Sequence, residues 1–174
     1  MTKSDLVILD ANIVIDAHRE GYINPLVNGH QIHLPRTVVQ DEAHFFADGV
    51  EKKSIRLTPL IQAGKIKVIE ADIEDEKRLH SLVKSIYLSA FDPGEREALA
   101  LLTNPQYKNF LFCTADRAAI KGLSILGMSQ RGVSAEKLLV KIGDSRKLKR
   151  NFTEDWFKKA LQEGVDEKHL WRVS

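Results

Sequence analysis

The stretch LVILDANIVID, residues 6–16, decides the fold class of this 174-residue chain. Its first four residues, Leu6–Leu9, form a short continuous apolar run, which is typical of a strand buried in a parallel sheet. Asp10 follows at once, and apolar residues at helical spacing predict a helix from Ile13 to Glu20. A buried strand that leads directly into a helix indicates an α/β fold.

Strands and helices alternate along the rest of the chain. We predict further strands at residues 32–34, 65–70, 109–114 and 124–128, and helices at residues 37–48, 52–63, 73–90, 117–122, 134–142 and 153–162, with another beginning after Asp92. This alternation predicts a three-layer α/β/α sandwich with a central, mainly parallel sheet. We expect one domain over residues 1–145, with the basic segment and helix of residues 146–174 packed on it.

Composition excludes several classes of protein. The chain is 43% hydrophobic and 29% charged, which is enough apolar material for a core. No apolar run reaches the roughly 18 residues of a membrane helix. A single cysteine, Cys113, excludes an internal disulfide framework and a multi-cysteine zinc site. The start, MTKSDLVILD, has no small-residue cleavage site, so we expect a cytoplasmic protein.

Charge is unevenly distributed although the formal net charge is only +2. Residues 70–97 hold eight acidic and four basic residues, whereas residues 117–150 hold nine basic and two acidic residues. A basic surface beside an acidic pocket suits a polyanion that is held by its phosphates near bound cations. Two ordinary solvated faces would give the same pattern.

Two aspartates follow predicted strands. Asp10 ends the LVIL run, and Asp116 comes shortly after the FLFCT run. Ligands of open α/β sheets gather at the carboxyl ends of the strands, so we expect both side chains to project into one crevice.

Two glutamates lie on the apolar stripes of predicted helices. Glu42 shares its stripe with Val38, Phe45 and Phe46, and Glu97 shares a face with Leu101. A carboxylate that points toward a core is destabilising unless it is paired or bound to a cation. A cation shared with the two aspartates explains all four placements, and carboxylates with water suit Mg²⁺ or Mn²⁺.

Each acid also has a structural interpretation. Asp10 is also suited to a strand-end turn and Asp116 to a helix cap, and Glu42 can pair with a nearby basic residue. Asp92 fits a helix cap better than a metal ligand, and Glu95 fits either the acid of a capping box or a second acid of the site. The four acids in this order favour the metal interpretation over chance.

The chain resembles the PIN-domain family of metal-dependent nucleases, in particular the bacterial and archaeal branch that includes toxin ribonucleases. The resemblance spans about Leu6 to Ile142 and rests on LVILDANIVID, LPRTVVQDEAHF, GEREALALL and FCTADRAAIKGLSILG. The four acids of the family match Asp10, Glu42, Glu97 and Asp116. The chain departs from typical toxin members in its greater length and its added segments RKLKR and FTEDWFKKALQEG.

The resemblance implies a metal-dependent endoribonuclease, which cleaves RNA and leaves a 5′-phosphate and a 3′-hydroxyl. It also implies an acidic pocket for one or two Mg²⁺ or Mn²⁺ ions. The resemblance further implies a homodimer, which is frequent in the family, and an antitoxin partner, which is typical of the toxin branch. Asp10, Glu42, Glu97 and Asp116 would hold the ion, with water activated as the nucleophile. Supporting residues that orient these ligands or the water would be Asn12, Glu95 and Thr114. Phosphate contacts on RNA, or on DNA, would come from Arg117, Lys121, Arg131, Arg146, Lys147, Lys149 and Arg150.

Three other functions compete with this interpretation. The chain could be a PIN-like nucleic-acid-binding module without catalysis, or a toxin whose pocket is closed by an arginine of a partner. Aspartyl-phosphate chemistry at Asp10 is disfavoured, because the D-x-D-x-T pattern that it needs is absent: Asn12 and Val14 stand at its last two positions.

Overall fold

The computed structural model describes residues 4–174, and the polar lead at residues 1–3 lies outside the described residues. Its centre is a five-stranded sheet in which all neighbouring strands are parallel. Ile8 in the middle strand pairs with His33 on one side and with Phe112 on the other. The order across the sheet is β5 (Ile66–Ile69), β2 (Gln31–Pro35), β1 (Leu6–Leu9), β6 (Leu111–Cys113) and β7 (Gly132–Val133).

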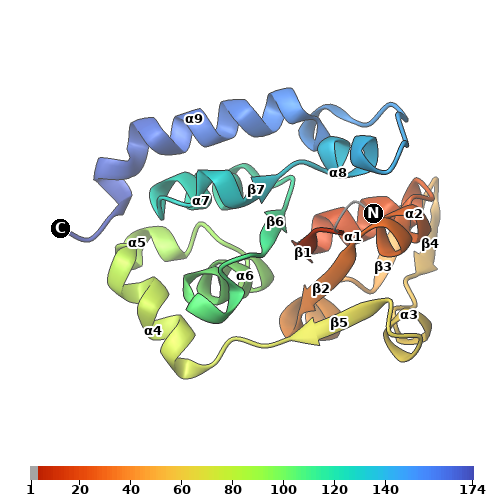
Figure 1. Cartoon of the computed structure of the whole chain (residues 1–174), viewed down its shortest axis with the longest axis horizontal. Coiled ribbons are helices and arrows are strands. Elements are labelled where there is room, and N and C mark those ends of the chain that lie inside the picture. Colours follow the sequence, from red (N-terminus) through yellow and green to blue (C-terminus); the bar gives the residue numbers. More distant parts are fainter. Residues whose placement is uncertain (1–3) are drawn as a thin grey trace.

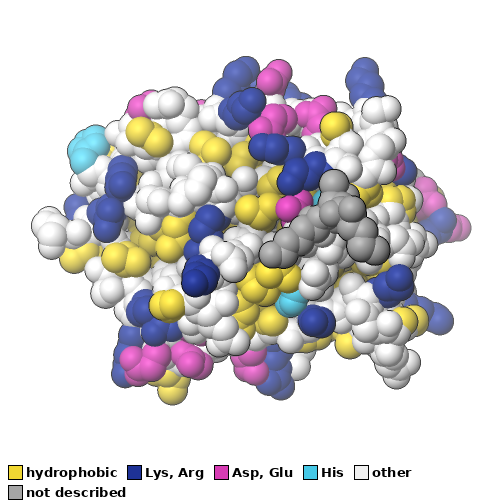
Figure 2. All heavy atoms as spheres, viewed as in Figure 1, with side chains coloured by type: hydrophobic (Ala, Val, Ile, Leu, Met, Phe, Trp, Pro, Cys, Tyr) yellow, Lys and Arg dark blue, Asp and Glu magenta, His cyan; other side chains and the backbone are white. Residues whose placement is uncertain are grey.

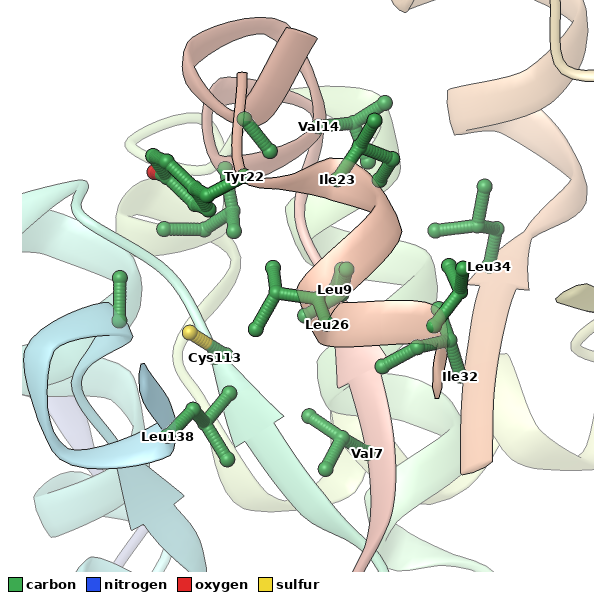
Figure 3. Packing of buried hydrophobic residues seen from close by; sticks show 14 of the residues in the cluster. Val7, Leu9, Val14, Tyr22, Ile23, Leu26, Ile32, Leu34, Cys113 and Leu138 are labelled. Atoms are coloured by element: carbon green, nitrogen blue, oxygen red, sulfur yellow. The ribbon is translucent and has the colours of Figure 1, made fainter. Parts of the chain in front are cut away.

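Helices cover both faces of this sheet, because successive side chains of a strand point to opposite faces. Val7 and Leu9 of β1 pack in one core, shown in Figure 3, with α1 (Ala11–Arg19), α2 (Ile23–Gly29) and α8 (Ala135–Lys141). Ile8 packs in the other core with α4 (Ile73–Leu82), α6 (Pro93–Thr103), α7 (Arg117–Ile125) and α9 (Glu154–Trp171). The fold is therefore the predicted three-layer α/β/α sandwich (Figure 1).

The C-terminal helix α9 lies along α7 and belongs to the second core (Figure 1). Phe157, Ala160 and Trp171 are its buried core residues. Gly164 allows the close approach, because a Cβ atom there would lie 2.6 Å from the carbonyl oxygen of Lys121. The short helices α3 (Thr58–Gln62) and α5 (Ser85–Leu88) complete the set. No helix within residues 4–174 is long and apolar enough to cross a membrane.

Residues 45–54 form a hairpin where two helices were predicted, so this prediction was wrong. β3 (Phe45–Asp48) pairs antiparallel with β4 (Glu51–Ser54). The turn between them contains Gly49 with φ of 63°. An Asp-Gly pair is a strong hairpin signal because glycine adopts positive φ at little cost. This local turn preference outweighs the helical spacing of the apolar residues.

Two further elements differ from the prediction. The predicted strand at residues 124–128 is instead the end of α7, whose apolar run supplies the buried Leu123 and Ile125 before Gly127 (φ 74°) follows the helix. A short apolar run of this kind fits helix and strand equally well by period. Helix α2 has no counterpart among the predicted elements, and it buries Leu26 and Val27.

Candidate metal centre

The site lies at the carboxyl ends of β1 and β6, where the order of the strands along the chain reverses. After β1, the chain places β2 and then β5 on one side of β1. It later places β6 and then β7 on the other side of β1. Crevices at such a reversal are the usual ligand sites of open α/β sheets. Asp10 follows β1 directly, and Thr114 follows β6 directly. The topology thus places both strand ends beside one crevice.

Hydrogen bonds join the two strand ends. Asp10 accepts from the amide of Ala11 at Oδ1 (2.7 Å) and from the hydroxyl of Thr114 at Oδ2 (2.7 Å). The same Thr114 hydroxyl accepts from the amide of Asp116 (3.0 Å). Asn12 Oδ1 accepts from the amide of Ala115 (3.2 Å). Thr114 and Asn12 therefore orient Asp10 and the loop that carries Asp116.

Asp116 occupies the N-cap position of α7. Its Oδ1 accepts from the amide of Ala119 at 3.1 Å, which is the usual capping contact. A carboxylate has about four acceptor sites, so the cap leaves acceptor capacity on the same side chain. Asp116 therefore serves as a cap and still raises, through its negative charge, the pKa of Asp10.

Glu42 reaches the site from a single π-helical turn, Val38–Glu42. Its end is marked by the bond from the amide of Ala43 to the carbonyl of Val38 (2.9 Å), five residues back. Glu42 Oε1 accepts from the amide of Gly94 at the start of α6 (2.9 Å). A Cβ atom at Gly94 would lie 2.2 Å from Glu42 Oε2, so the contact requires glycine. Single π-turns occur frequently at functional sites.

Glu95 is the acid of α6 that lines the site. Its Oε2 accepts from the amide of Asp92 (2.9 Å), as in a capping box. The side chain is 3% exposed. Around it opens a cleft of about 700 Å³, whose lining includes Asp10, Asn12, Thr37, Asp41, Glu42, Asp92 and Glu95. Asp41 and Asp92 thus add to the acidity of the cleft, although neither was a predicted site residue.

Glu97, the predicted third acid, has a different position. Its Oε2 accepts from the amide of Thr37 (2.9 Å) and its Oε1 from the amide of Ala71 (3.2 Å). It is buried, and it is absent from the residues that line the cleft. The inward face of α6 at this turn meets the backbone after β2 and after β5, whereas Glu95 meets the cleft. Glu97 therefore joins three elements beside the cleft, and its charge contributes to the raised pKa of Glu42.

Burial and mutual repulsion raise the pKa values of the cleft acids. Burial raises the pKa of Asp10 to about 7, with smaller contributions from the charges of Glu42 and Asp116. Burial, followed by the charges of Asp10 and Asp116, raises the pKa of Glu95 to about 9. The pKa of Glu42 is also raised, first by burial and then by Asp92, Asp41 and Glu97. The carboxylates therefore repel one another across the cleft.

No basic side chain neutralises these acids. Across residues 4–174, neither Asp10, Glu42, Glu95 nor Asp116 has a Lys, Arg or His nitrogen within 4.0 Å. In the same range, no three His, Cys, Asp or Glu side chains already stand at the distances of a formed metal site. An all-oxygen donor set with buried, unpaired carboxylates fits a hard divalent cation such as Mg²⁺ or Mn²⁺.

Most of the predicted phosphate-binding residues have partners within the protein. Arg117 pairs with Glu163 (2.6 Å) and Lys121 with Glu167 (2.6 Å). The remaining pairs are Arg146 with Asp144 (2.7 Å) and Lys149 with Glu20 (3.4 Å). Figure 2 accordingly shows Lys and Arg side chains among Asp and Glu side chains on the face it presents. The basic run in the sequence does not form a patch of one sign here.

Arg131 has a structural role. Its guanidinium donates to the carbonyls of Leu102 (2.7 Å) and Phe110 (3.1 Å) and to that of Tyr107. These bonds satisfy three backbone acceptors between α6 and β6, so Arg131 is not available to a phosphate. Lys147 and Arg150 are exposed and have no ion pair within residues 4–174.

The sequence alone contains the signals for part of the cleft. The strand-end rule identifies Asp10 and Asp116, and the capping pattern identifies Asp92 and Glu95. Nothing in the sequence marks Asp41, because its place depends on the π-turn. Comparison with known proteins adds no name to this geometry: the chain matches no protein-family model, no curated protein and no solved structure.

Proposed function

We propose that this chain is a Mg²⁺- or Mn²⁺-dependent endoribonuclease of the PIN type. One observation carries the proposal: acids from separate elements surround one open cleft at the strand reversal, and no basic residue of the described chain pairs with them. Unpaired buried carboxylates either hold protons or bind a cation. The resemblance of the sequence motifs to metal-dependent nucleases supports the second outcome.

The residues that would hold the ion are Asp10, Glu42, Glu95 and Asp116. When bound, a divalent cation of this kind lowers the pKa of a coordinated water and neutralises charge on a phosphate. The hydroxyl of Thr114 donates a hydrogen bond to Asp10, and this bond favours the ionised form of the Asp10 carboxylate. Glu42 is held by Gly94, and Glu95 by Asp92, so two of the acids have fixed orientations before any substrate arrives.

The cleft is open and has room for a segment of a polymer. Its volume is about 700 Å³, and its lining includes the apolar side chains of Ala11, Ile15 and Pro93 beside the acids. A phosphodiester with flanking nucleotides can therefore enter it from solvent.

The matched pair Glu95→Gln and Glu97→Gln tests the proposal. Both substitutions replace one carboxyl group near the start of α6 by an amide, but only Glu95 lines the cleft. We expect Asp10→Asn and Glu95→Gln to weaken Mn²⁺ binding by calorimetry, and cleavage of single-stranded RNA, by at least about 100-fold, beyond the usual range for residues that only support a ligand. Glu97→Gln should retain Mn²⁺ binding and lower the free energy of unfolding by about 1–2 kcal/mol.

Two results would contradict parts of the proposal. Failure of the wild-type chain to bind Mn²⁺ at millimolar concentration would reject the metal site. Metal binding without cleavage of RNA or DNA would instead favour a nucleic-acid-binding module without catalysis.

A further inference from the structure

A second hollow lies between the start of α7 and the first half of α9. It has a volume of about 200 Å³ and is lined by Arg117, Arg150, Trp156, Lys159, Ala160 and Glu163. Arg117 is the residue directly after Asp116, which caps α7 and is one of the acids proposed above to hold the ion. The hollow therefore begins one residue from the candidate metal centre, on the α9 side of α7.

The side chains around the hollow carry an excess of positive charge. Three are cationic, and the one acid is Glu163, which binds Arg117 through its Nε (2.6 Å). Arg150 and Lys159 are exposed and form no ion pair within residues 4–174. The pair at Arg117 uses one nitrogen of the guanidinium and leaves its terminal nitrogens without an acceptor in that range. The hollow thus retains unused donors for an anion.

Trp156 supplies a second observation at the same place. The guanidinium carbon of Arg150 lies 5.3 Å from the centre of the Trp156 ring. The indole nitrogen of Trp156 is buried and has no hydrogen-bond acceptor among residues 4–174. An unmet buried donor is destabilising, and indole can only donate. Arg150 and Trp156 thus place a guanidinium and an aromatic ring together in the lining of the hollow.

We propose that this hollow binds a backbone phosphate of single-stranded RNA and guides the strand toward the acidic cleft. Guanidinium groups match phosphate geometry, and a neighbouring aromatic ring with arginine is typical of surfaces that bind single strands. Most of the other predicted phosphate ligands are paired within the protein, whereas Arg150 and Lys159 of this hollow have no ion pair within residues 4–174. The identity of the polymer rests on the proposed ribonuclease function, whereas the anion site itself does not.

Two double variants with equal charge change provide the test. Arg150→Gln with Lys159→Gln removes two cations from the hollow. Lys84→Gln with Lys108→Gln removes two exposed cations that have no ion pair within residues 4–174 and do not line it. Binding of a labelled single-stranded RNA of about 12 nucleotides is measured by fluorescence anisotropy in EDTA, where no metal-dependent cleavage occurs. The Kd is measured at several salt concentrations.

The hollow variant should raise the Kd about 10-fold and reduce the slope of log K against log salt by about 1.4, the value for two lost contacts on a single strand. The control variant should change the Kd less than about 2-fold. Equal effects of both variants, or no effect of the hollow variant, would overturn the proposal. Because the assay contains no metal, a failure of RNA binding in the hollow variant stays distinguishable from a failure of catalysis at Asp10 or Glu95.

Discussion

Hydrogen bonding and burial have opposite effects on the pKa of Asp10. Both of its oxygens accept hydrogen bonds, one from the amide of Ala11 and one from the hydroxyl of Thr114, and these bonds favour the ionised form. Its burial favours the neutral form more strongly, so its pKa rises to about 7. A bound cation would lower the pKa of Asp10 again, because a nearby positive charge stabilises the ionised carboxylate.

The raised pKa values predict how stability depends on pH in the absence of metal. Asp10 and Glu95 titrate near 3.8 and 4.5 when unfolded, and at about 7 and about 9 when folded. Between these values the folded chain binds more protons than the unfolded chain, so the free energy of unfolding falls as pH rises. We expect urea unfolding in EDTA to show a loss on the order of a few kcal/mol between about pH 5 and about pH 9.

Two variants and added Mn²⁺ distinguish the contributions of Asp10 and Glu95 to this pH dependence. Asp10→Asn should flatten the dependence below about pH 7, and Glu95→Gln should flatten it up to about pH 9. Saturating Mn²⁺ should reduce or reverse the loss, because the cation favours the ionised carboxylates. An identical slope in the wild type and both variants would mean that these acids are not protonated in the fold.

The sequence predicts the strand-end acids better than the helical acids. Asp10 and Asp116 follow apolar runs, and parallel strands bring their carboxyl ends to one edge. Glu97 was placed in the site because helical spacing points it inward with Leu101. Spacing gives the direction of a side chain relative to its own helix, but the neighbour that it meets depends on how the helix docks. Thr37 and Ala71, which bind Glu97, lie 60 and 26 residues away in the sequence.

At the scale of elements, the first turn of α6 fixes the cleft. Gly94 binds Glu42, Glu95 lines the cleft, and Glu97 holds the amides of Thr37 and Ala71. Neighbouring residues of one turn thus determine the positions of acids that come from two elements. A change at Gly94 or Glu95 should alter the site more than it alters stability, whereas a change at Glu97 should mainly alter stability.

Gly94→Ala is the sharpest change of this kind. The new Cβ atom would meet Glu42 Oε2 at 2.2 Å and Val38 Cγ2 at 2.9 Å. The end of the Glu42 side chain can move away, so we expect the fold to persist with a loss of about 1 kcal/mol for the broken hydrogen bond. Mn²⁺ affinity should fall about 10- to 100-fold, measured by calorimetry. Unchanged affinity would show that Glu42 is not required for the metal.

The elements that the sequence predicted poorly are those set by local backbone geometry. The π-turn at Val38–Glu42 and the hairpin at Phe45–Ser54 lie where two helices, at residues 37–48 and 52–63, were predicted. The Asp48–Gly49 pair was a usable signal for the hairpin. The π-turn has no comparable sequence signal, because it differs from an α-turn by one residue in its hydrogen bond.

At the scale of the whole molecule, α9 holds the second layer of helices together. It packs along α7 and buries Phe157 and Ala160 in the same core as Leu99 of α6. The contact is close because Gly164 faces the backbone of Lys121. The helix also contributes Trp156 and Lys159 to the hollow described above, so its docking on α7 brings these side chains to Arg117.

Gly164→Ala tests this packing through the sign of its effect. In an exposed helix this substitution stabilises by about 1 kcal/mol, because alanine is the better helix former. Here the added Cβ atom would lie 2.6 Å from the Lys121 carbonyl oxygen and 2.8 Å from its Cα, and backbone atoms cannot move aside easily. We expect the free energy of unfolding to fall by about 1–3 kcal/mol in urea.

The neighbouring residue provides the control for this substitution. Val165 is 52% exposed on the same helix, so Val165→Ala should change the free energy of unfolding by less than about 0.5 kcal/mol. A Gly164→Ala variant that is more stable than the wild type would show that α9 does not pack closely against the backbone of α7 at Lys121.

The long sequence separation between Glu97 and its partner Thr37 has a consequence for biosynthesis. Residues 37–42 gain the contacts that aim Glu42 only after α6 has been made and has docked on them. Ordering contacts across such long loops carries an entropic cost that local structure does not offset early. A nascent chain interrupted before residue 93 therefore carries Asp10 and Glu42 without their supports, and the acids of the cleft are assembled only after most of the polypeptide has emerged.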